Sequence, residues 1–242
     1  MGKTAKIWLL TAAGLVLAGC ALFAGVMAAR GWDFAGLSTV SYETNTHKID
    51  VPFRGIALTT NTADIVLAQS EDGTCRVVCH EEADARHAVA VEQDVLTVTL
   101  DETGTWYDHI GLRFGAPRIT VYLPETAYGA LTVSESIGNV DVPGAFTFES
   151  VDITTGTGNV VFGAAAQETV TIRTGTGSVR FDGADAAGLF VTTGTGNVTG
   201  SLRSGKVFLA QSDTGDVEVP AATTGGRCEI RTGTGNIRIE IG

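Results

Sequence analysis

Hydrophobic and polar residues alternate along most of the chain, and the alternation recurs with a regular spacing. Aligning the chain on a recurrent glycine gives spacings of 20, 19, 19, 19 and 20 residues. Such a period is typical of repeat proteins, in which each unit buries its apolar face by stacking on its neighbours. The aligned glycines are Gly138, Gly158, Gly177, Gly196, Gly215 and Gly235.

Each aligned glycine has pairs of mostly apolar residues on both sides, two positions apart. Val151 and Ile153 precede Gly158 in this way, and Val160 and Phe162 follow it. Alternation at period two is the pattern of a strand with one buried face. The sequence therefore predicts an all-β fold, a parallel β-solenoid (β-helix-like) with coils of about 19 residues that hold two strands each.

The glycine motif itself is TTGTGNV at residues 154–160 and again at 192–198. A chain reversal between two strands needs backbone angles that glycine tolerates best and asparagine next. We therefore interpret the six aligned glycines as structural turn residues. The Asn, Ser or Asp after each glycine is expected to bond to the turn and to the next coil. The threonines one and three positions before the glycine are expected to form an outer ladder.

Other interpretations of the motif fit less well. A phosphate-binding loop occurs once and opens a helix, whereas this motif recurs and leads into another strand. Calcium-binding repeats have a nine-residue period with regular aspartates, which are scattered here. Threonine rows of ice-binding solenoids lie on flat strands, whereas a glycine between the threonines indicates a bent corner.

The first thirty residues have a different pattern. Residues 7–29 are uncharged and would span about 34 Å as a helix, enough to cross a bilayer core. Lys3 and Lys6 precede this segment, so the positive-inside rule places the N-terminus in the cytoplasm and the rest of the chain outside. We expect an uncleaved single-pass anchor in the cell membrane.

Two alternatives remain for this segment. Residues 17–20 (LAGC) resemble a lipoprotein cleavage motif, which would make Cys20 a lipidated N-terminus, but nine apolar residues follow Cys20. A cleaved secretory signal usually has a shorter apolar region than this one.

The predicted organisation of the chain has four parts. They are a cytoplasmic tip and transmembrane helix (1–30), a juxtamembrane linker (31–43), an irregular β part (44–130) and the regular repeats (131–242).

The charge of the chain excludes one class of partner. The formal net charge of −11 argues against nucleic acid as a partner, because phosphate binding needs clustered Lys and Arg.

The cysteines and the acid–base residues do not form a recognisable site. Cys75 and Cys79 lie four residues apart on one predicted strand, so their Cα atoms would be about 13 Å apart in an extended chain, too far for a disulfide. His80 points away from Cys79, so we interpret the cysteines as core residues and predict no metal site. Asp108 and His109 have no recognisable nucleophile beside them.

Several segments together resemble a known family. They are the apolar anchor with LAGC, TNTADIVL (60–67), WYDHIGLRFG (106–115) leading into RITVYLP (118–124), and the tandem TGNV-type repeats. This combination is similar to a bacterial envelope family, a domain of unknown function often called a "putative adhesin". The resemblance implies a surface-facing strand-repeat protein, and some relatives act in envelope-stress responses. It supplies no catalytic residues and no cofactor.

The resulting hypothesis is a membrane-anchored, extracytoplasmic, non-catalytic binding or scaffold module of the bacterial cell envelope. The alternative is an envelope-stress regulator that contacts a membrane partner. An enzyme acting on polysaccharides and an ice-binding protein fit less well. Phe190 and Leu209 occupy the same outward position of consecutive coils, so we expect them to form one contiguous apolar patch for a partner or for self-association. Residues 237–241 are expected to end the solenoid as a sheet edge.

Overall fold

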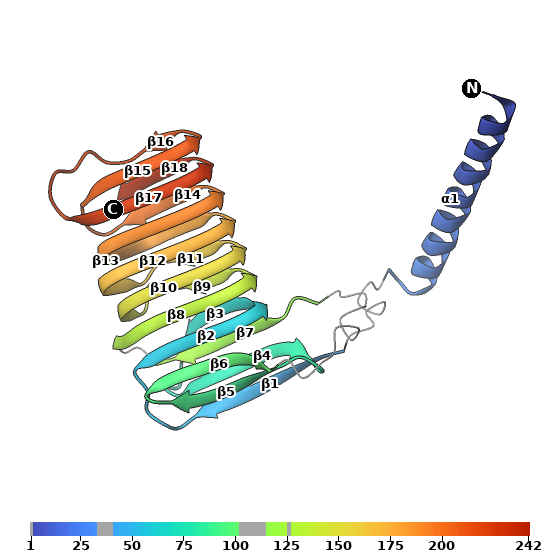
Figure 1. Ribbon diagram of the computed structural model, residues 1–242. Coiled ribbons are helices and arrows are strands. Elements are labelled where there is room, and N and C mark those ends of the chain that lie inside the picture. The colour runs from blue at the N-terminus through green and yellow to red at the C-terminus, as the bar shows by residue number, and fades with distance from the viewer. Residues whose placement is uncertain (1, 33–40, 102–114, 125–126) are drawn as a thin grey trace. The chain divides into compact units, whose positions relative to one another are not determined.

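The computed structural model describes residues 2–32, 41–101, 115–124 and 127–242 (Figure 1). Helix α1 (Lys3–Ala29) belongs to one compact unit, and the strands β1 to β18 belong to a second.

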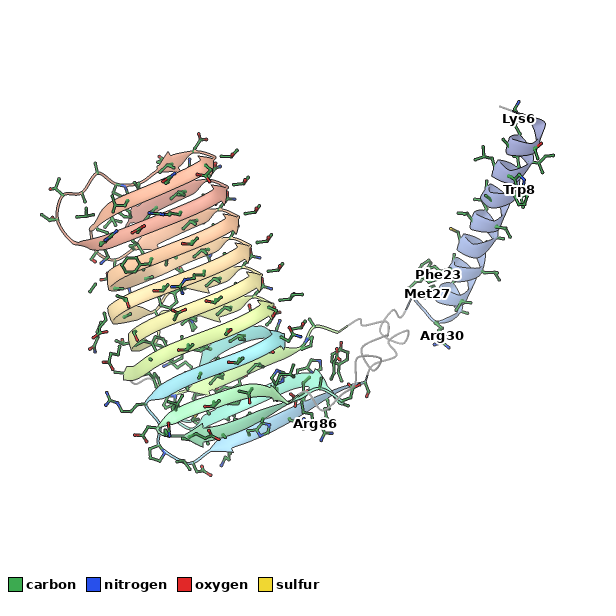
Figure 2. The ribbon with its side chains drawn as sticks, in the orientation of Figure 1. Lys6, Trp8, Phe23, Met27, Arg30 and Arg86 are labelled. Atoms are coloured by element: carbon green, nitrogen blue, oxygen red, sulfur yellow. The ribbon has the colours of Figure 1, made fainter. Side chains whose placement is uncertain are left out.

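Helix α1 is apolar around its whole circumference. Residues 4–29 have a mean hydropathy of 2.2, and the helix is long and apolar enough to cross a membrane. Trp8 and Phe23 extend outward from the helix (Figure 2), with 72% and 54% of their surface exposed. The hydroxyl of Thr11 donates to the carbonyl of Ile7 at 3.0 Å, so its polar group is bonded within the helix. The helix ends before Gly31 and Trp32, which both have positive φ.

Strands make up most of the second unit. The strands before residue 125 are β1 (Tyr42–Ile49), β2 (Gly55–Thr62), β3 (Asp64–Gln69), β4 (Cys75–Glu82), β5 (Arg86–Glu92), β6 (Val95–Asp101) and β7 (Arg118–Leu123). The later strands are β8 (Ala127–Ile137), β9 (Val140–Val142), β10 (Thr147–Thr157), β11 (Val160–Phe162), β12 (Ala165–Thr176), β13 (Val179–Thr195), β14 (Val198–Leu202), β15 (Lys206–Thr214), β16 (Val217–Glu218), β17 (Gly226–Thr234) and β18 (Ile237–Ile241).

The strands form two sheets, and most neighbours are parallel. One sheet runs in the order β5-β6-β2-β8-β10-β12-β13-β17-β15. The other runs in the order β1-β4-β7-β3-β9-β11-β13-β14-β18-β16. Strand β13 is long enough to contribute to both. The predicted mostly β fold with parallel pairing is confirmed, and its rungs are stacked in a solenoid-like arrangement (Figure 1).

The core lies between the two sheets and consists of the residues that the alternation predicted. Val151 pairs with Val170, and Val170 pairs with Leu189, so equivalent inner residues stack from one coil to the next. All three are at most 2% exposed. A side chain that is covered above, below and from the opposite sheet contributes about 1.5–3 kcal/mol through burial. Stacked apolar rows therefore hold the unit together.

The aligned glycines lie at the corners between the two sheets. Gly158, Gly177 and Gly196 have φ between 152° and 157°, a region that other residues rarely adopt. A Cβ atom on Gly177 would overlap the carbonyl oxygen of Gly158 in the preceding coil. The corners of neighbouring coils therefore approach so closely that only hydrogen fits at this position.

Asparagine side chains connect successive corners. Asn139 Oδ1 accepts from the backbone N–H of Asn159 at 3.0 Å, and Asn159 Oδ1 accepts from that of Ser178 at 2.9 Å. The row continues to Asn197, Asn236 and Asp216. It begins at Asp64, whose carboxylate accepts from the backbone N–H of Asn139. Each polar side chain thus satisfies a corner N–H in the adjoining coil.

The expectation of a single outer threonine ladder is wrong for half of its members. The threonines three positions before the glycine point inward, and Thr155, Thr174 and Thr193 are at most 5% exposed. Their hydroxyls donate to glycine carbonyls of the adjoining coil, as Thr193 does to Gly177 at 3.0 Å. The glycine between the two threonines shifts them onto different faces. Of the two threonines assigned to the ladder in each coil, only the one directly before the aligned glycine is exposed, as at Thr157, Thr176 and Thr195.

The order of coils in space differs from their order in the chain at the C-terminal end. β17 and β18 lie between the coil of β13 and β14 and the coil of β15 and β16. Figure 1 shows β15 and β16 beyond the red strands β17 and β18. The prediction that residues 237–241 form a sheet edge is therefore wrong for residues 237 and 238, which pair with β14 and with β16, whereas residues 239–241 pair with β14 alone.

A similar inversion occurs near the N-terminus. β2 and β3 lie between β6 and β7 on one side and β8 and β9 on the other. Beyond them, β4 is antiparallel to both β1 and β7, and β5 is antiparallel to β6. The predicted strand that carries Cys75 and Cys79 is β4, and the segment RITVYLP forms β7.

Candidate interaction surface

Phe190 and Leu209 do not form one contiguous patch, which corrects the sequence expectation. Phe190 of β13 is in register with Glu229 of β17, and Glu229 is in register with Leu209 of β15. The two apolar residues are therefore two strands apart instead of one. The prediction assumed that coils stack in chain order, and the insertion of β17 breaks that assumption.

Charged groups occupy the space between these two residues. The carboxylate of Glu229 accepts from Arg227 at 2.6 Å and from Arg231 at 2.8 Å. The Arg227 guanidinium also lies 5.9 Å from the centre of the Phe190 ring. Arginine over a ring face is a favourable but modest interaction at an exposed site. Phe190 thus belongs to a polar cluster on β13 and β17.

Leu209 belongs instead to the open end of the strand unit. β15 pairs with β17 on one side and with no described strand on the other, and β16 likewise pairs with β18 alone. Val207, Leu209 and Val217 are 38%, 54% and 44% exposed. We name β15, β16 and these three side chains the C-terminal edge. An unpaired strand with exposed apolar residues is a template for another strand.

The inner face of the C-terminal edge is only partly covered. Phe208, Ala210 and Val219 pack against the core but remain half-buried, whereas the equivalent Cys228 and Ile230 in the adjoining strand are fully buried. A coil with a neighbour on one side leaves part of its apolar surface in contact with water. This edge therefore has apolar surface to bury against a partner.

A buried lysine fixes the start of β15. The Lys206 ammonium lies 2.6 Å from Asp185 Oδ1 and donates to Ser204 Oγ at 2.6 Å, with only 3% of Lys206 exposed. Burial opposes ionisation of Asp185, but the hydrogen bonds from Lys206 and Ser204 prevail and lower the pKa of its carboxyl. The bonds of Lys206 thus hold the start of β15 in place, and the residues that follow, 207–212, are uncharged.

Acidic groups border the far end of the C-terminal edge. Asp213, Asp216 and Glu218 are all exposed, and Glu218 accepts from Arg238 at 2.8 Å. A shallow groove of about 160 Å³ lies beside them, on the outer face of β14, β16 and β18. The edge therefore combines an apolar strand with an acidic end, which favours a partner strand carrying basic residues next to apolar ones.

The remaining sequence candidates fall elsewhere. Cys79 and Cys228 are buried, Cys75 is half-buried, and His80 faces outward as expected. His80 and Arg118 line a separate depression of about 410 Å³ on the outer face of β1, β4 and β7. Asp108 and His109 lie outside the described residues.

Sequence reasoning missed a buried polar cluster near the N-terminal end of the strand unit. Glu81 of β4 and His87 of β5 are 1% and 5% exposed, and their side chains are hydrogen-bonded at 2.7 Å. The signal in the sequence was weak: Glu81 continues the inward alternation of Cys75, Val77 and Cys79, which predicts that a charged residue is buried.

Comparison with known proteins agrees with this architecture. A solved "putative adhesin" from Bacteroides fragilis is 18% identical, with 83% of this chain and 97% of that chain covered and a TM-score of 0.50. A solved "putative cell adhesion protein" from Clostridium sporogenes is 12% identical, with 84% and 100% covered and a TM-score of 0.52. At these identities the likeness concerns the fold. No curated protein matches the chain.

The chain also matches a family model. Residues 53–242, which comprise nearly all of the strand unit, match the model described as Toastrack DUF4097. This agrees with the resemblance seen in the repeats and in the segment 118–124. The chain is a member of the Toastrack DUF4097 family.

Proposed function

We propose that this protein is a membrane-anchored, extracytoplasmic β-solenoid that acts as a non-catalytic binding module of the bacterial envelope. The observation that carries the proposal is the C-terminal edge, where β15 has one free side and Leu209 is 54% exposed. A strand edge of this kind binds an extended segment by backbone hydrogen bonds, and the side chains beside it select the sequence.

The partner we propose is an extended protein segment that adds to β15 as a further strand. Val207 and Leu209 would pack against its apolar side chains. Asp213 and Glu218 would attract its basic residues, which a second copy of this acidic edge does not offer. The adhesion-related names of the two similar solved proteins also support a binding role.

The location is part of the same proposal. Helix α1 belongs to a separate compact unit from the strands and is long and apolar enough to cross a membrane. Lys3 and Lys6 on the N-terminal side favour a cytoplasmic N-terminus. Cys20 would then lie within the membrane as an unmodified residue. Mass spectrometry of the intact protein would distinguish this uncleaved anchor from a lipidated Cys20 or a cleaved signal.

Site-specific crosslinking in cells tests the binding role. A photoreactive residue replaces Leu209 at the C-terminal edge or, as a matched control, Thr171, an outward residue of the interior strand β12. We expect a discrete crosslinked protein from position 209 only, and its loss when Val207 is replaced by lysine. Equal crosslinking from both positions, or none from position 209, would contradict the proposal. A product with twice the mass of the chain would identify a second copy as the occupant instead.

A further inference from the structure

A cluster of three different ligand types lies at the N-terminal end of the strand unit. The Cys79 sulfur, a Glu81 carboxylate oxygen and a His87 ring nitrogen all lie within 4.8 Å of one another. The three residues are 0%, 1% and 5% exposed. We propose that this cluster is a buried site for a zinc ion.

The fold brings these residues together from two strands. Cys79 and Glu81 are two positions apart on β4, so both side chains point into the core. The chain then turns through residues 83–85, and His87 is the second residue of β5, a strand of the opposite sheet. The pairing of Arg86 (Figure 2) with Glu43 of β1 holds the start of β5 in place.

Neighbouring strands fix the orientation of the potential ligands. Asn45 of β1 donates to Glu81 Oε1 at 2.8 Å, while Glu81 Oε2 accepts from the backbone N–H of His87 at 2.7 Å and faces its Nδ1. Thr60 of β2 bonds to His87 Nε2 at 3.0 Å, which leaves Nδ1 directed at Glu81. Metal-binding histidines and carboxylates in proteins are oriented by outer partners of this kind. Each residue thus offers one ligand atom to a common point.

The present bonding is compatible with replacement of a proton by a metal. Glu81 Oε2 and His87 Nδ1 are hydrogen-bonded at 2.7 Å. In a tetrahedral zinc site these atoms would be about 3.3 Å apart, so a small widening is sufficient. His87 would then carry its proton on Nε2 and donate it to the Thr60 hydroxyl.

The donor set indicates which ion the site would prefer. A thiolate, an imidazole and a carboxylate together suit zinc, whereas magnesium and calcium prefer oxygen ligands alone. Zinc binds the deprotonated thiolate, so metal binding would release the proton of Cys79. Three protein ligands leave a fourth position for water.

Cobalt and zinc titrations of the full chain in detergent micelles test this site. All variants carry Cys20→Ser, which removes the exposed thiol of α1. The metal-free protein is kept reduced, and Co²⁺ is added while the absorption spectrum is recorded. We expect one equivalent of Co²⁺ to give a thiolate-to-metal charge-transfer band and the intense visible bands of tetrahedral cobalt. One equivalent of Zn²⁺ should abolish these bands.

Matched variants identify the ligands. Cys79→Ser and His87→Gln should each eliminate the charge-transfer band, whereas Cys228→Ser, which alters another fully buried thiol, should retain it. Thr60→Val, which removes only the outer partner of His87, should weaken zinc binding by about 10- to 100-fold. If Cys79→Ser or His87→Gln fails to fold, Thr60→Val decides the question. Absence of stoichiometric binding, an unchanged band in Cys79→Ser, or unchanged affinity in Thr60→Val would show that the Glu81–His87 pair is purely structural.

Discussion

The interior coils and the C-terminal coil share the same glycine motif, but the sequence of the C-terminal coil departs further from it. The interior corners around Gly158, Gly177 and Gly196 are nearly identical in sequence, and each is covered by a coil on both sides. The coil of β15 and β16 has Ser212 in place of the inner threonine and leaves Val217 exposed. The corner and inner residues of an interior coil must pack against two adjoining coils, whereas those of a terminal coil pack against one.

The comparison also gives a reason for the inverted order of the last two coils. β17 and β18 carry the full motif RTGTGNI, and Cys228, Ile230 and Ile237 are fully buried between neighbours. The coil of β15 and β16 offers Phe208, Ala210 and Val219 at its inner positions. Placing the better-matched coil inside buries more apolar surface, which favours the observed order.

The largest difference between the two regions is expected at the corner glycines. We expect Gly177→Val to reduce the free energy of unfolding by about 4 kcal/mol or more, through backbone strain and overlap with Gly158. Gly215→Val should reduce it by about 1 kcal/mol, because the terminal coil can detach with the loss of few core contacts. Urea unfolding of the full chain in detergent, followed by circular dichroism, measures both. Equal losses would show that the terminal coil is as constrained as the interior.

Replacing one leucine in each region compares how much side-chain packing contributes to stability in the interior and at the C-terminal edge. Leu189 of β13 is 0% exposed, and Leu209 of β15 is 54% exposed. We expect Leu189→Ala to cost about 3 kcal/mol of stability and Leu209→Ala less than about 0.5 kcal/mol. The same unfolding measurement applies. A large loss for Leu209→Ala would mean that Leu209 is covered in solution, contrary to its place on a free edge.

One interior coil departs from the threonine row, and the departure should make stability depend on pH. Glu135 takes the position of the inner threonine, is 5% exposed, and neither of its carboxyl oxygens has a hydrogen-bond partner among the described residues. Burial, reinforced by the nearby charge of Asp64, outweighs the opposing effect of the neighbouring Thr155 hydroxyl and raises the pKa of Glu135 to about 7. A carboxyl with a raised pKa in the folded state favours folding while protonated, so its cost grows as pH rises from about 4.5 to 7.

We therefore expect Glu135→Thr to stabilise the protein by about 2 to 3 kcal/mol at pH 8 and by much less at pH 4.5. The threonine would restore a hydroxyl donor, and the ionised carboxylate would no longer be buried. Unfolding measured in urea across this pH range tests the difference. Glu149→Thr, which alters an exposed carboxylate on β10, serves as the control and should not change the pH profile. An identical profile for wild type and Glu135→Thr would contradict the expectation.

The smallest effects concern single hydroxyls. Thr193 donates to Gly177 from a site that is 2% exposed, and Ser212 donates to Gly235 from the half-buried terminal coil. We expect Thr193→Val to cost about 1 kcal/mol and Ser212→Ala less, because water can replace the terminal bond. Thermal unfolding of both variants measures the difference, which should be a few degrees. A greater loss for Ser212→Ala would reverse the proposed contrast between covered and open coils.

The sequence was sufficient for the features that depend on local periodicity. Alternation located the inner rows, such as Val151 and Val170, and the glycine spacing located the corners. The apolar segment 7–29 predicted the helix. These features follow from the period of a strand or from the length of an apolar segment, so neighbours in the chain determine them.

The features that the sequence did not predict depend on contacts between distant segments. Coils were assumed to stack in chain order, which is common for consecutive strands but fails for β17. That one insertion separates Phe190 from Leu209 and makes β15 and β16, instead of β17 and β18, the outermost coil. The approach of Cys79, Glu81 and His87 depends on the turn between two sheets, which no spacing within β4 indicates.

The position of β17 and β18 also has a consequence for the time course of folding. Most coils can dock as soon as they emerge from the ribosome or from a membrane channel, because their template is already complete. The coil of β15 and β16 cannot, since the strands that it pairs with are made after it. Residues 206–218 therefore stay without their partner strands until residues 226–241 have also emerged. A delay in those last residues therefore leaves an apolar strand exposed at the stage when proteases and neighbouring chains can reach it.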